Sequence, residues 1–164
     1  MLTWFLMSFF LNSGSAFQVL EGIIPVFPKV IEPCQGISQN LLKATKDVAE
    51  QLTNSGYPVV VGGRHSTGSI CNERRWNGYG YTVLHESFTE IQVSERLLNS
   101  PHTLHNVVLH EVLHSLGLHH SEEEGMMKYA VSENWWGGVV EDQRKLWLSL
   151  DDLQGLYHLR ELFN

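Results

Sequence analysis

The sequence of 164 residues contains few cysteines, few prolines and few basic residues, all of which mark particular classes of protein when they are abundant. It has two cysteines, five prolines and only 11 Lys and Arg residues, and these form no basic cluster. No apolar run approaches the ~20 residues that a membrane-spanning helix needs, and no repeat or low-complexity run divides the sequence. With a net charge of -7, nucleic acid is not expected as a partner. The length suits one domain with a sizeable core.

The longest apolar stretch lies at the N-terminus. Residues 1–11 are almost wholly apolar, and the small residues Gly14 and Ala16 follow in the spacing typical of signal-peptide cleavage. The stretch is too short for a membrane span. We therefore predict a secretory signal over residues 1–16 and a secreted, extracellular domain over residues 17–164.

Apolar periodicity predicts the elements of that domain. We expect an extended segment or strand at 18–31, a helix at 38–53, strands at 57–61, 79–84 and 90–94, and helices at 101–116 and 150–162. Ser38 is the predicted N-cap of the first helix, and Ser149 and Asp152 form a predicted capping box at the start of the last one. Residues 64–80, rich in Gly, Ser, Asn and Arg, predict a loop. This order predicts one α+β or α/β domain in which helices cover a mixed sheet.

One motif carries chemistry, the sequence HExxHxxGxxH at residues 110–120. His110 and His114 stand one helical turn apart, so both imidazoles project from the same face. Glu111 can then reach a water molecule at a metal without binding the metal itself. Gly117 permits a turn that returns His120 to the same point. Three imidazoles with an open fourth position predict a catalytic zinc site rather than a closed structural one.

Incidental histidines on an amphipathic core helix are the alternative explanation. Chance placement of this pattern is on the order of one in several thousand. His119 falls outside the spacing and is expected to be solvated or to lie behind the ligands.

The motif, followed by a methionine, resembles the metzincin metallopeptidases, whose fold is a mixed sheet with two helices above a cleft and a Met-turn beneath the metal. On this resemblance His110, His114 and His120 are the zinc ligands and Glu111 the catalytic base. Met127 best matches the Met-turn residue.

Two alternatives stay open near that turn. Met126 is a one-residue alternative to Met127. Tyr129 stands where the resemblance leaves room for a fifth zinc ligand or a donor to the transition state.

Within the metzincins the chain resembles the matrixin branch. His120-Ser121 matches the end of the matrixin motif, and residues 148–157 are similar to the start of the matrixin final helix. The charge of Asp151 and Asp152 is equally explained by the preference of helix N-termini for carboxylates.

The accessory features of matrixins are not apparent in the sequence. No run resembles their structural zinc and calcium loops, and His65 and His85 are isolated, so we expect one catalytic Zn²⁺ and doubt any structural Zn²⁺ or Ca²⁺. The sequence around Cys34 only loosely echoes the matrixin cysteine switch. A disulfide between Cys34 and Cys71 is the favoured interpretation, because two cysteines in a secreted protein pair by default.

The resemblance implies a zinc endopeptidase that acts as a monomer on extended protein or peptide substrates. The predicted strand at 79–84 is a suitable edge for such a substrate to pair with. The alternatives are a secreted zinc-binding interaction module with little or no turnover, and a hydrolase that uses only His110 and His114 with a downstream carboxylate. Glu111 argues against the first and His120 against the second.

Overall fold

The computed structural model describes residues 27–74, 78–121, 125–127 and 148–163. In order, its elements are β1 (Lys29–Pro33), α1 (Gln39–Asn54), β2 (Val59–Val61), β3 (Gly68–Glu73), β4 (Gly80–Leu84), β5 (Thr89–Ser94), the 3-10 turn η1 (Glu95–Leu97), α2 (Pro101–Ser115) and α3 (Leu150–Phe163). This confirms the predicted α+β class and all three predicted helices. The predicted signal, residues 1–16, lies outside the described residues.

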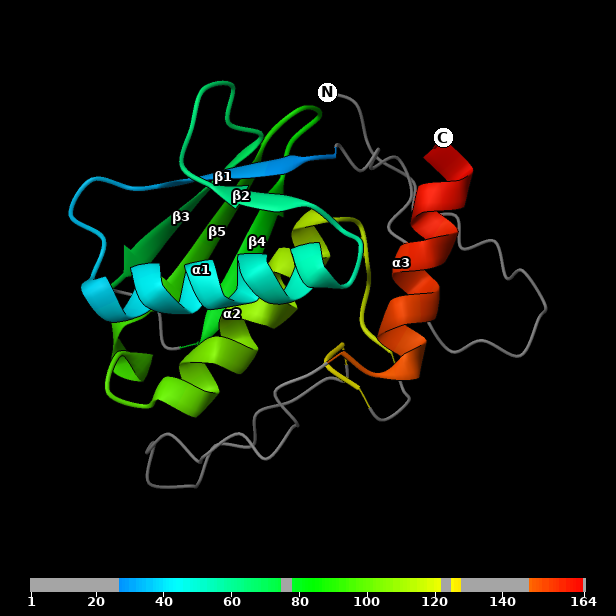
Figure 1. Ribbon diagram of the computed structural model, residues 1–164. Helices are drawn as coiled ribbons and strands as arrows, with labels where there is room; N and C mark the ends of the chain where they lie inside the picture. The colour runs from blue at the N-terminus through cyan, green and yellow to red at the C-terminus, as the bar shows by residue number, and fades with distance from the viewer. Residues whose placement is uncertain (1–26, 75–77, 122–124, 128–147, 164) are drawn as a thin grey trace, which may run out of the picture.

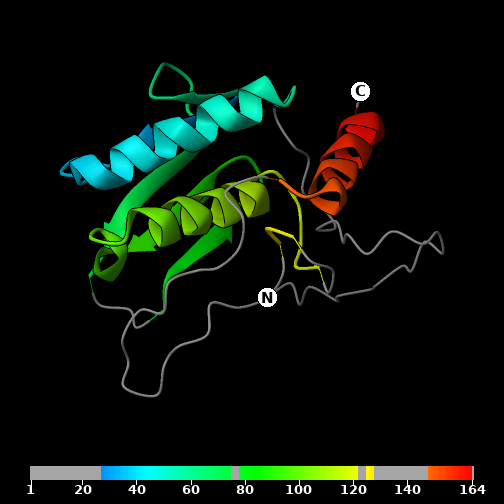
Figure 2. The ribbon, with the colours of Figure 1, turned by 60° about the horizontal axis from the view of Figure 1, so that its bottom comes forward.

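The strands form one mixed sheet in the order β2-β1-β3-β5-β4. All neighbours are parallel except β4, which runs antiparallel to β5 and pairs Thr82 with Ile91. Both α1 and α2 lie on the same face of the sheet, and α3 lies beyond their C-terminal ends (Figures 1 and 2). This arrangement leaves β4 as an edge strand on the side of the sheet nearest α2.

The prediction of a loop over residues 64–80 was wrong for β3, which is the central strand. β3 reads GSICNE and has a single fully buried aliphatic side chain, Ile70. Gly68 is required there, because a Cβ would lie 2.5 Å from the hydroxyl oxygen of Thr89 on β5. A strand with glycine, serine and asparagine at so many of its positions lacks the apolar alternation on which strand prediction depends.

The helices form for the reasons expected from the sequence. Ser38 caps α1, since its side chain accepts a hydrogen bond from the Leu41 amide at 3.1 Å. Pro101 begins α2, where its missing N–H is not needed. The buried residues of α2 lie all round the helix: Thr103, Leu104, Asn106, Val107, Val108, Leu109, Glu111, Val112, Leu113 and Ser115. A helix buried on this scale is held rigidly, which suits it to carry a functional site.

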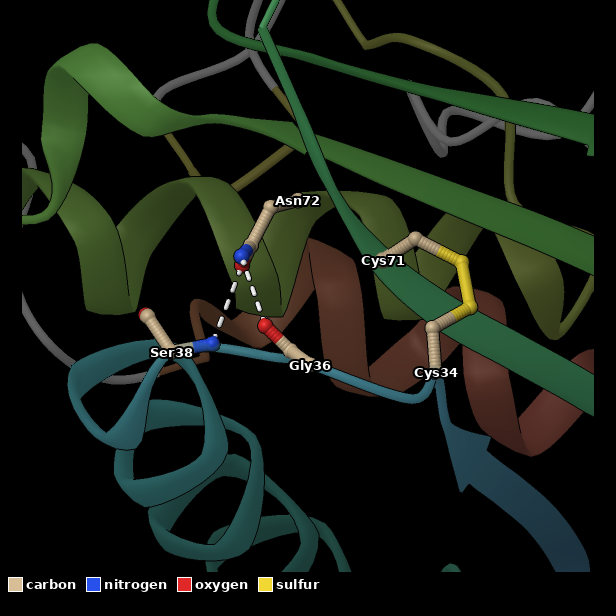
Figure 3. Close-up of a disulfide and its surroundings, with 5 residues drawn as sticks. All are labelled: Cys34, Gly36, Ser38, Cys71 and Asn72. Atoms are coloured by element: carbon tan, nitrogen blue, oxygen red, sulfur yellow. Dashed lines mark hydrogen bonds between the residues drawn. A yellow bond between two sulfur atoms is a disulfide. The ribbon is translucent and has the colours of Figure 1, made fainter.

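A disulfide joins Cys34, just after β1, to Cys71 on β3 (Figure 3). The pairing confirms the prediction from the cysteine count. Beside it the Asn72 amide accepts from the Ser38 N–H at 3.3 Å and donates to the Gly36 carbonyl at 3.4 Å. The two cysteines are separated by 37 positions in the sequence, and for a loop of this size chain entropy predicts a stabilisation of about 2–4 kcal/mol. The turn that leads from β1 into α1 is therefore fixed to the middle of the sheet.

Lys29, at the start of β1, is a buried lysine with 4% of its surface exposed. Its amine donates to the Thr67 carbonyl at 3.2 Å. Burial lowers the pKa of Lys29 from 10.5 to about 8, because the charged ammonium loses its hydration. Folding at neutral pH therefore carries a charge into the core.

Replacing Lys29 with Met should raise the free energy of unfolding by about 1–3 kcal/mol at pH 7. Between about pH 8 and 10.5 the unfolded chain holds a proton at Lys29 that the folded chain has released. Wild-type stability therefore rises with pH across that window, and the gain from Lys29→Met fades over the same range. Urea unfolding at pH 7 and at pH 10.5 measures both effects. The exposed Lys46→Met on α1 is the control, and a gain independent of pH would contradict the prediction.

Candidate metal centre

Three histidines converge at the C-terminal end of α2. The Nε2 atom of His110 lies 3.1 Å from that of His114 and 3.2 Å from that of His120, and the last two are 3.2 Å apart. All three side chains are partly exposed and could hold one metal ion. The structure therefore brings together the three residues that the motif singled out.

A tight turn after α2 makes this convergence possible. The helix ends at Ser115, and Gly117 adopts a φ of 104°, which lies in the left-handed region that disfavours side chains. The Leu118 amide then donates to the Leu113 carbonyl at 3.1 Å, which closes the helix end. As the motif predicted, the reversed chain returns His120 towards α2.

Hydrogen bonds at Nδ1 fix the orientation of the two helical imidazoles. Nδ1 of His110 lies 2.8 Å from the Met126 carbonyl oxygen, and Nδ1 of His114 lies 2.7 Å from the Leu118 carbonyl oxygen. A carbonyl oxygen only accepts, so each Nδ1 carries a hydrogen and donates it. In the neutral imidazole, Nε2 is then left with a lone pair.

When both imidazoles are neutral, the Nε2 lone pairs of His110 and His114 belong to atoms only 3.1 Å apart. Burial lowers the pKa of His114, although its hydrogen bond to Leu118 opposes the shift, so the neutral form is favoured. Facing lone pairs repel unless a cation lies between them. The triad has the electrostatics of a cation site.

Zinc fits these donors. Tetrahedral zinc with Zn–N bonds of ~2.0–2.1 Å separates its nitrogen ligands by about 3.3–3.4 Å, close to the 3.1–3.2 Å observed here. Three imidazole nitrogens also suit zinc better than calcium or magnesium, which prefer oxygen. Backbone carbonyls behind two of the imidazoles supply the outer hydrogen bonds that usually orient histidine ligands.

Glu111 is buried on the same turn of α2, with 5% of its surface exposed. Its Oε2 accepts a hydrogen bond from the Thr82 hydroxyl on β4 at 2.8 Å. Gly80, two residues earlier on β4, packs so closely that a Cβ there would lie 3.0 Å from Cγ and 3.1 Å from Oε1 of Glu111. The carboxylate is thus held between the motif helix and the edge strand. Neither contact was foreseen from the sequence, because neither Thr82 nor Gly80 belongs to a recognisable motif.

The methionine turn is held by Asp152 of α3. The Met126 amide donates to Oδ2 of Asp152 at 2.9 Å, and the Met127 amide donates to Oδ1 at 3.2 Å. Oδ2 also accepts from the backbone amide of Ser149 at 2.8 Å and from its hydroxyl at 2.7 Å, while that hydroxyl accepts from the Asp152 amide at 3.1 Å. The predicted capping box is confirmed, and the same carboxylate fixes the turn whose Met126 carbonyl orients His110.

The neighbouring carboxylate has a separate partner. Oδ2 of Asp151 accepts from the Ser121 hydroxyl at 2.9 Å, and the Ser121 amide donates to the Met127 carbonyl at 2.9 Å. The preference of helix N-termini for negative charge therefore does not fully explain Asp151 and Asp152, because each carboxylate also accepts specific hydrogen bonds. Both tie the segment around the triad to α3.

The other residues singled out in the sequence have three different outcomes. Met126 and Met127 are both buried, at 1% and 2% exposure, so the choice of Met127 as the Met-turn residue stays a prediction. His119 is exposed and stands beside His120 without joining the triad, as its spacing indicated. Tyr129 lies outside the described residues.

Comparison with known proteins decides the family. The matrixin family model matches residues 45–161, which is most of the chain and includes the whole motif. The chain is a matrixin. This confirms the resemblance drawn from the motif and the final helix. No curated protein matches it.

A solved structure, the GM1-bound form of the ECX AB5 holotoxin, contains a chain that is 15% identical to this matrixin. The match covers 89% of this chain and 76% of that chain with a TM-score of 0.44. At that level of likeness we draw nothing from it.

Membership of the matrixin family supports a metal site at the three histidines, because matrixins are zinc peptidases and the matched region contains all three residues. In the part of this matrixin that the structure describes, no helix is long and apolar enough to cross a membrane. The disulfide fits an extracellular protein.

Proposed function

We propose that this matrixin is a secreted endopeptidase that hydrolyses peptide bonds with one zinc ion and Glu111 as its general base. The observation that carries the proposal is the His110–His114–His120 triangle, in which fixed Nδ1–H groups leave lone pairs directed at one another. A metal ion at the centre of the triangle would accept these lone pairs, and the spacing suits zinc.

His110, His114 and His120 would hold the ion. When bound, zinc supplies a Lewis acid that polarises a peptide carbonyl and makes water more acidic. Glu111 would accept the proton of the attacking water and deliver it to the departing amine. Its burial supports this role, because a carboxylate away from bulk solvent holds and passes a proton without competition from water.

The substrate would bind as an extended strand along β4. This strand is at the edge of the sheet, and Val83 on it is 39% exposed. Strand addition at such an edge uses backbone hydrogen bonds, which suits a peptidase that accepts varied sequences. The contact from Thr82 to Glu111 supports this placement, because a peptide beside β4 would then also run beside the proposed base.

Secretion is part of the proposal. It rests on the signal-like residues 1–16 and on the disulfide between Cys34 and Cys71, since disulfides persist in oxidising compartments. A start of the secreted protein at residue 17 in N-terminal sequencing would support it, whereas retention of the signal would contradict it.

Metal removal tests the proposed zinc. We expect about one Zn²⁺ per chain by elemental analysis, consistent with a single three-histidine site. Chelation should abolish cleavage of casein, and added Zn²⁺ should restore it. His120→Ala should lose most of the bound zinc, whereas His119→Ala, one residue away and outside the triad, should keep it.

The results also separate the alternatives. Stoichiometric zinc without cleavage of casein, gelatin or a mixed peptide library would favour a zinc-binding interaction module. Equal zinc contents in His120→Ala and the wild type would favour a site built from His110 and His114 alone.

A further inference from the structure

Thr82 lies in the middle of the edge strand β4 and directs its hydroxyl at the motif helix. The oxygen is 2.8 Å from Oε2 of Glu111 and 3.0 Å from the Glu111 backbone carbonyl. The sheet fixes the position of Thr82, because Thr82 pairs with the fully buried Ile91 in the antiparallel ladder with β5. A hydroxyl on a paired strand thus touches the side chain proposed as the base.

We propose that Thr82 is a positioning residue for Glu111, which couples the strand that would bind substrate to the group that would move the proton. The inference rests on the proposed function. Its new content is the role of Thr82 and the expectation that the role needs a hydroxyl rather than merely a side chain of that size.

The contact can fix the carboxylate strongly. A hydrogen bond to an ionised carboxylate is about twice as strong as one between neutral groups. Gly80, two residues earlier on the same strand, lies so close that an added Cβ would be 3.1 Å from the other oxygen, so residues of β4 confine both oxygens of the carboxylate. A side chain with three rotatable bonds is thereby restricted before substrate arrives, which is the preorganisation that proton transfer requires.

The second acceptor gives the hydroxyl a further use. It has one hydrogen, which can point to the carboxylate or to the Glu111 carbonyl. While the carboxylate is ionised, the hydroxyl would donate to it. After Glu111 has taken a proton from water, the hydroxyl would turn to the carbonyl and accept from the protonated carboxyl. Contact is kept in both states, and no proton is gained or lost by Thr82.

Thr82 would also transmit the binding of substrate to Glu111. A peptide added to β4 would pair with its backbone and order the strand, and Thr82 is the side chain through which that order reaches Glu111. We therefore expect that removing the Thr82 hydroxyl slows mainly the chemical step and has little effect on metal binding.

The test compares Thr82→Val and Thr82→Ser with the wild type in the full, zinc-loaded chain. Valine keeps the shape and removes the hydroxyl, whereas serine keeps the hydroxyl. Thr89→Val is the matched control: the same change on the neighbouring strand β5, at a buried hydroxyl oxygen that has no hydrogen-bond partner among the described residues. Peptide cleavage gives kcat and KM, and zinc content and Tm are measured for each protein.

Thr82→Val should lower kcat roughly 10- to 100-fold, the effect of losing one positioning hydrogen bond on a reacting group. KM should change by less than about threefold, and the zinc content should stay that of the wild type. Thr82→Ser should recover most of the lost kcat, and Thr89→Val should match the wild type. The visible spectrum of Co²⁺-substituted Thr82→Val should shift towards that of Glu111→Gln, which gives a readout independent of turnover.

Two results would overturn the inference alone: an active wild type with an equally active Thr82→Val, or a Thr82→Ser as impaired as Thr82→Val. Loss of zinc or a large fall in Tm in Thr82→Val, with serine restoring both, would assign Thr82 a structural role instead. A zinc-loaded wild type that cleaves nothing would overturn the proposed function, and this inference with it.

Discussion

Glu111→Gln should lower kcat for peptide cleavage by about 10²- to 10⁴-fold, the range expected for loss of a general base. Glutamine has nearly the same shape, and its carbonyl oxygen can still accept the hydrogen bond from Thr82. Its amide cannot take up a proton from water. The loss should therefore fall on kcat rather than on folding or metal binding.

Zinc content and Tm distinguish this outcome from general damage. The variant should bind about one zinc per chain, because the three imidazoles are unchanged. Glu50→Gln, the same substitution at an exposed position on α1, should cleave at the wild-type rate. If Glu111→Gln retained a tenth or more of wild-type kcat, the proton acceptor would have to be another group.

The motif was predictable because its geometry is local. His110 and His114 are four residues apart on one helix, and Gly117 is the residue whose left-handed φ turns the chain back. Spacing along the sequence therefore fixes the relative positions of all three imidazoles to a good approximation. The tautomers were not predictable, since the carbonyl that orients His110 belongs to Met126 and is supplied by another segment.

The contacts that complete the site join residues far apart in the sequence. Thr82 and Glu111 are separated by 29 positions, and Asp152 lies 26 positions beyond Met126. Nothing local distinguishes Thr82 from other strand threonines, and the pattern around Asp152 is explained by helix capping alone. The central strand β3 could not be predicted for a different reason. Packing against Thr89 requires Gly68 at a position where strand propensity favours a β-branched residue.

Asp152→Ala should lower the free energy of unfolding by about 3–5 kcal/mol, among the larger effects expected of a single substitution. Asp152 is 1% exposed, and its carboxylate accepts from the amides of Met126, Met127 and Ser149. Alanine would leave these N–H groups without their acceptor, two of them in buried hydrogen bonds. Urea unfolding followed by far-ultraviolet circular dichroism, which reports on the helices, measures the loss.

The same substitution should weaken zinc binding by about 10- to 100-fold, the range seen when outer hydrogen bonds to metal ligands are disturbed. The path is short: Asp152 fixes the Met126 amide, and the Met126 carbonyl accepts from Nδ1 of His110. Asp152→Asn should fall between wild type and alanine, because its amide oxygen can replace only one of the two acceptors. Competition with a zinc-sensitive dye gives the affinity of each variant.

Asp151→Ala is the matched control, because it removes a carboxylate from the same helical turn. Among the described residues it removes one side-chain hydrogen bond, that from the Ser121 hydroxyl, so the expected loss is about 0.5–1.5 kcal/mol with little change in zinc affinity. If Asp151→Ala and Asp152→Ala weakened zinc binding equally, negative charge near the site would explain the effect. A larger effect at Asp152 would show that α3 acts through the backbone of the methionine turn. The C-terminal helix would then be part of the metal site, although it contributes no ligand.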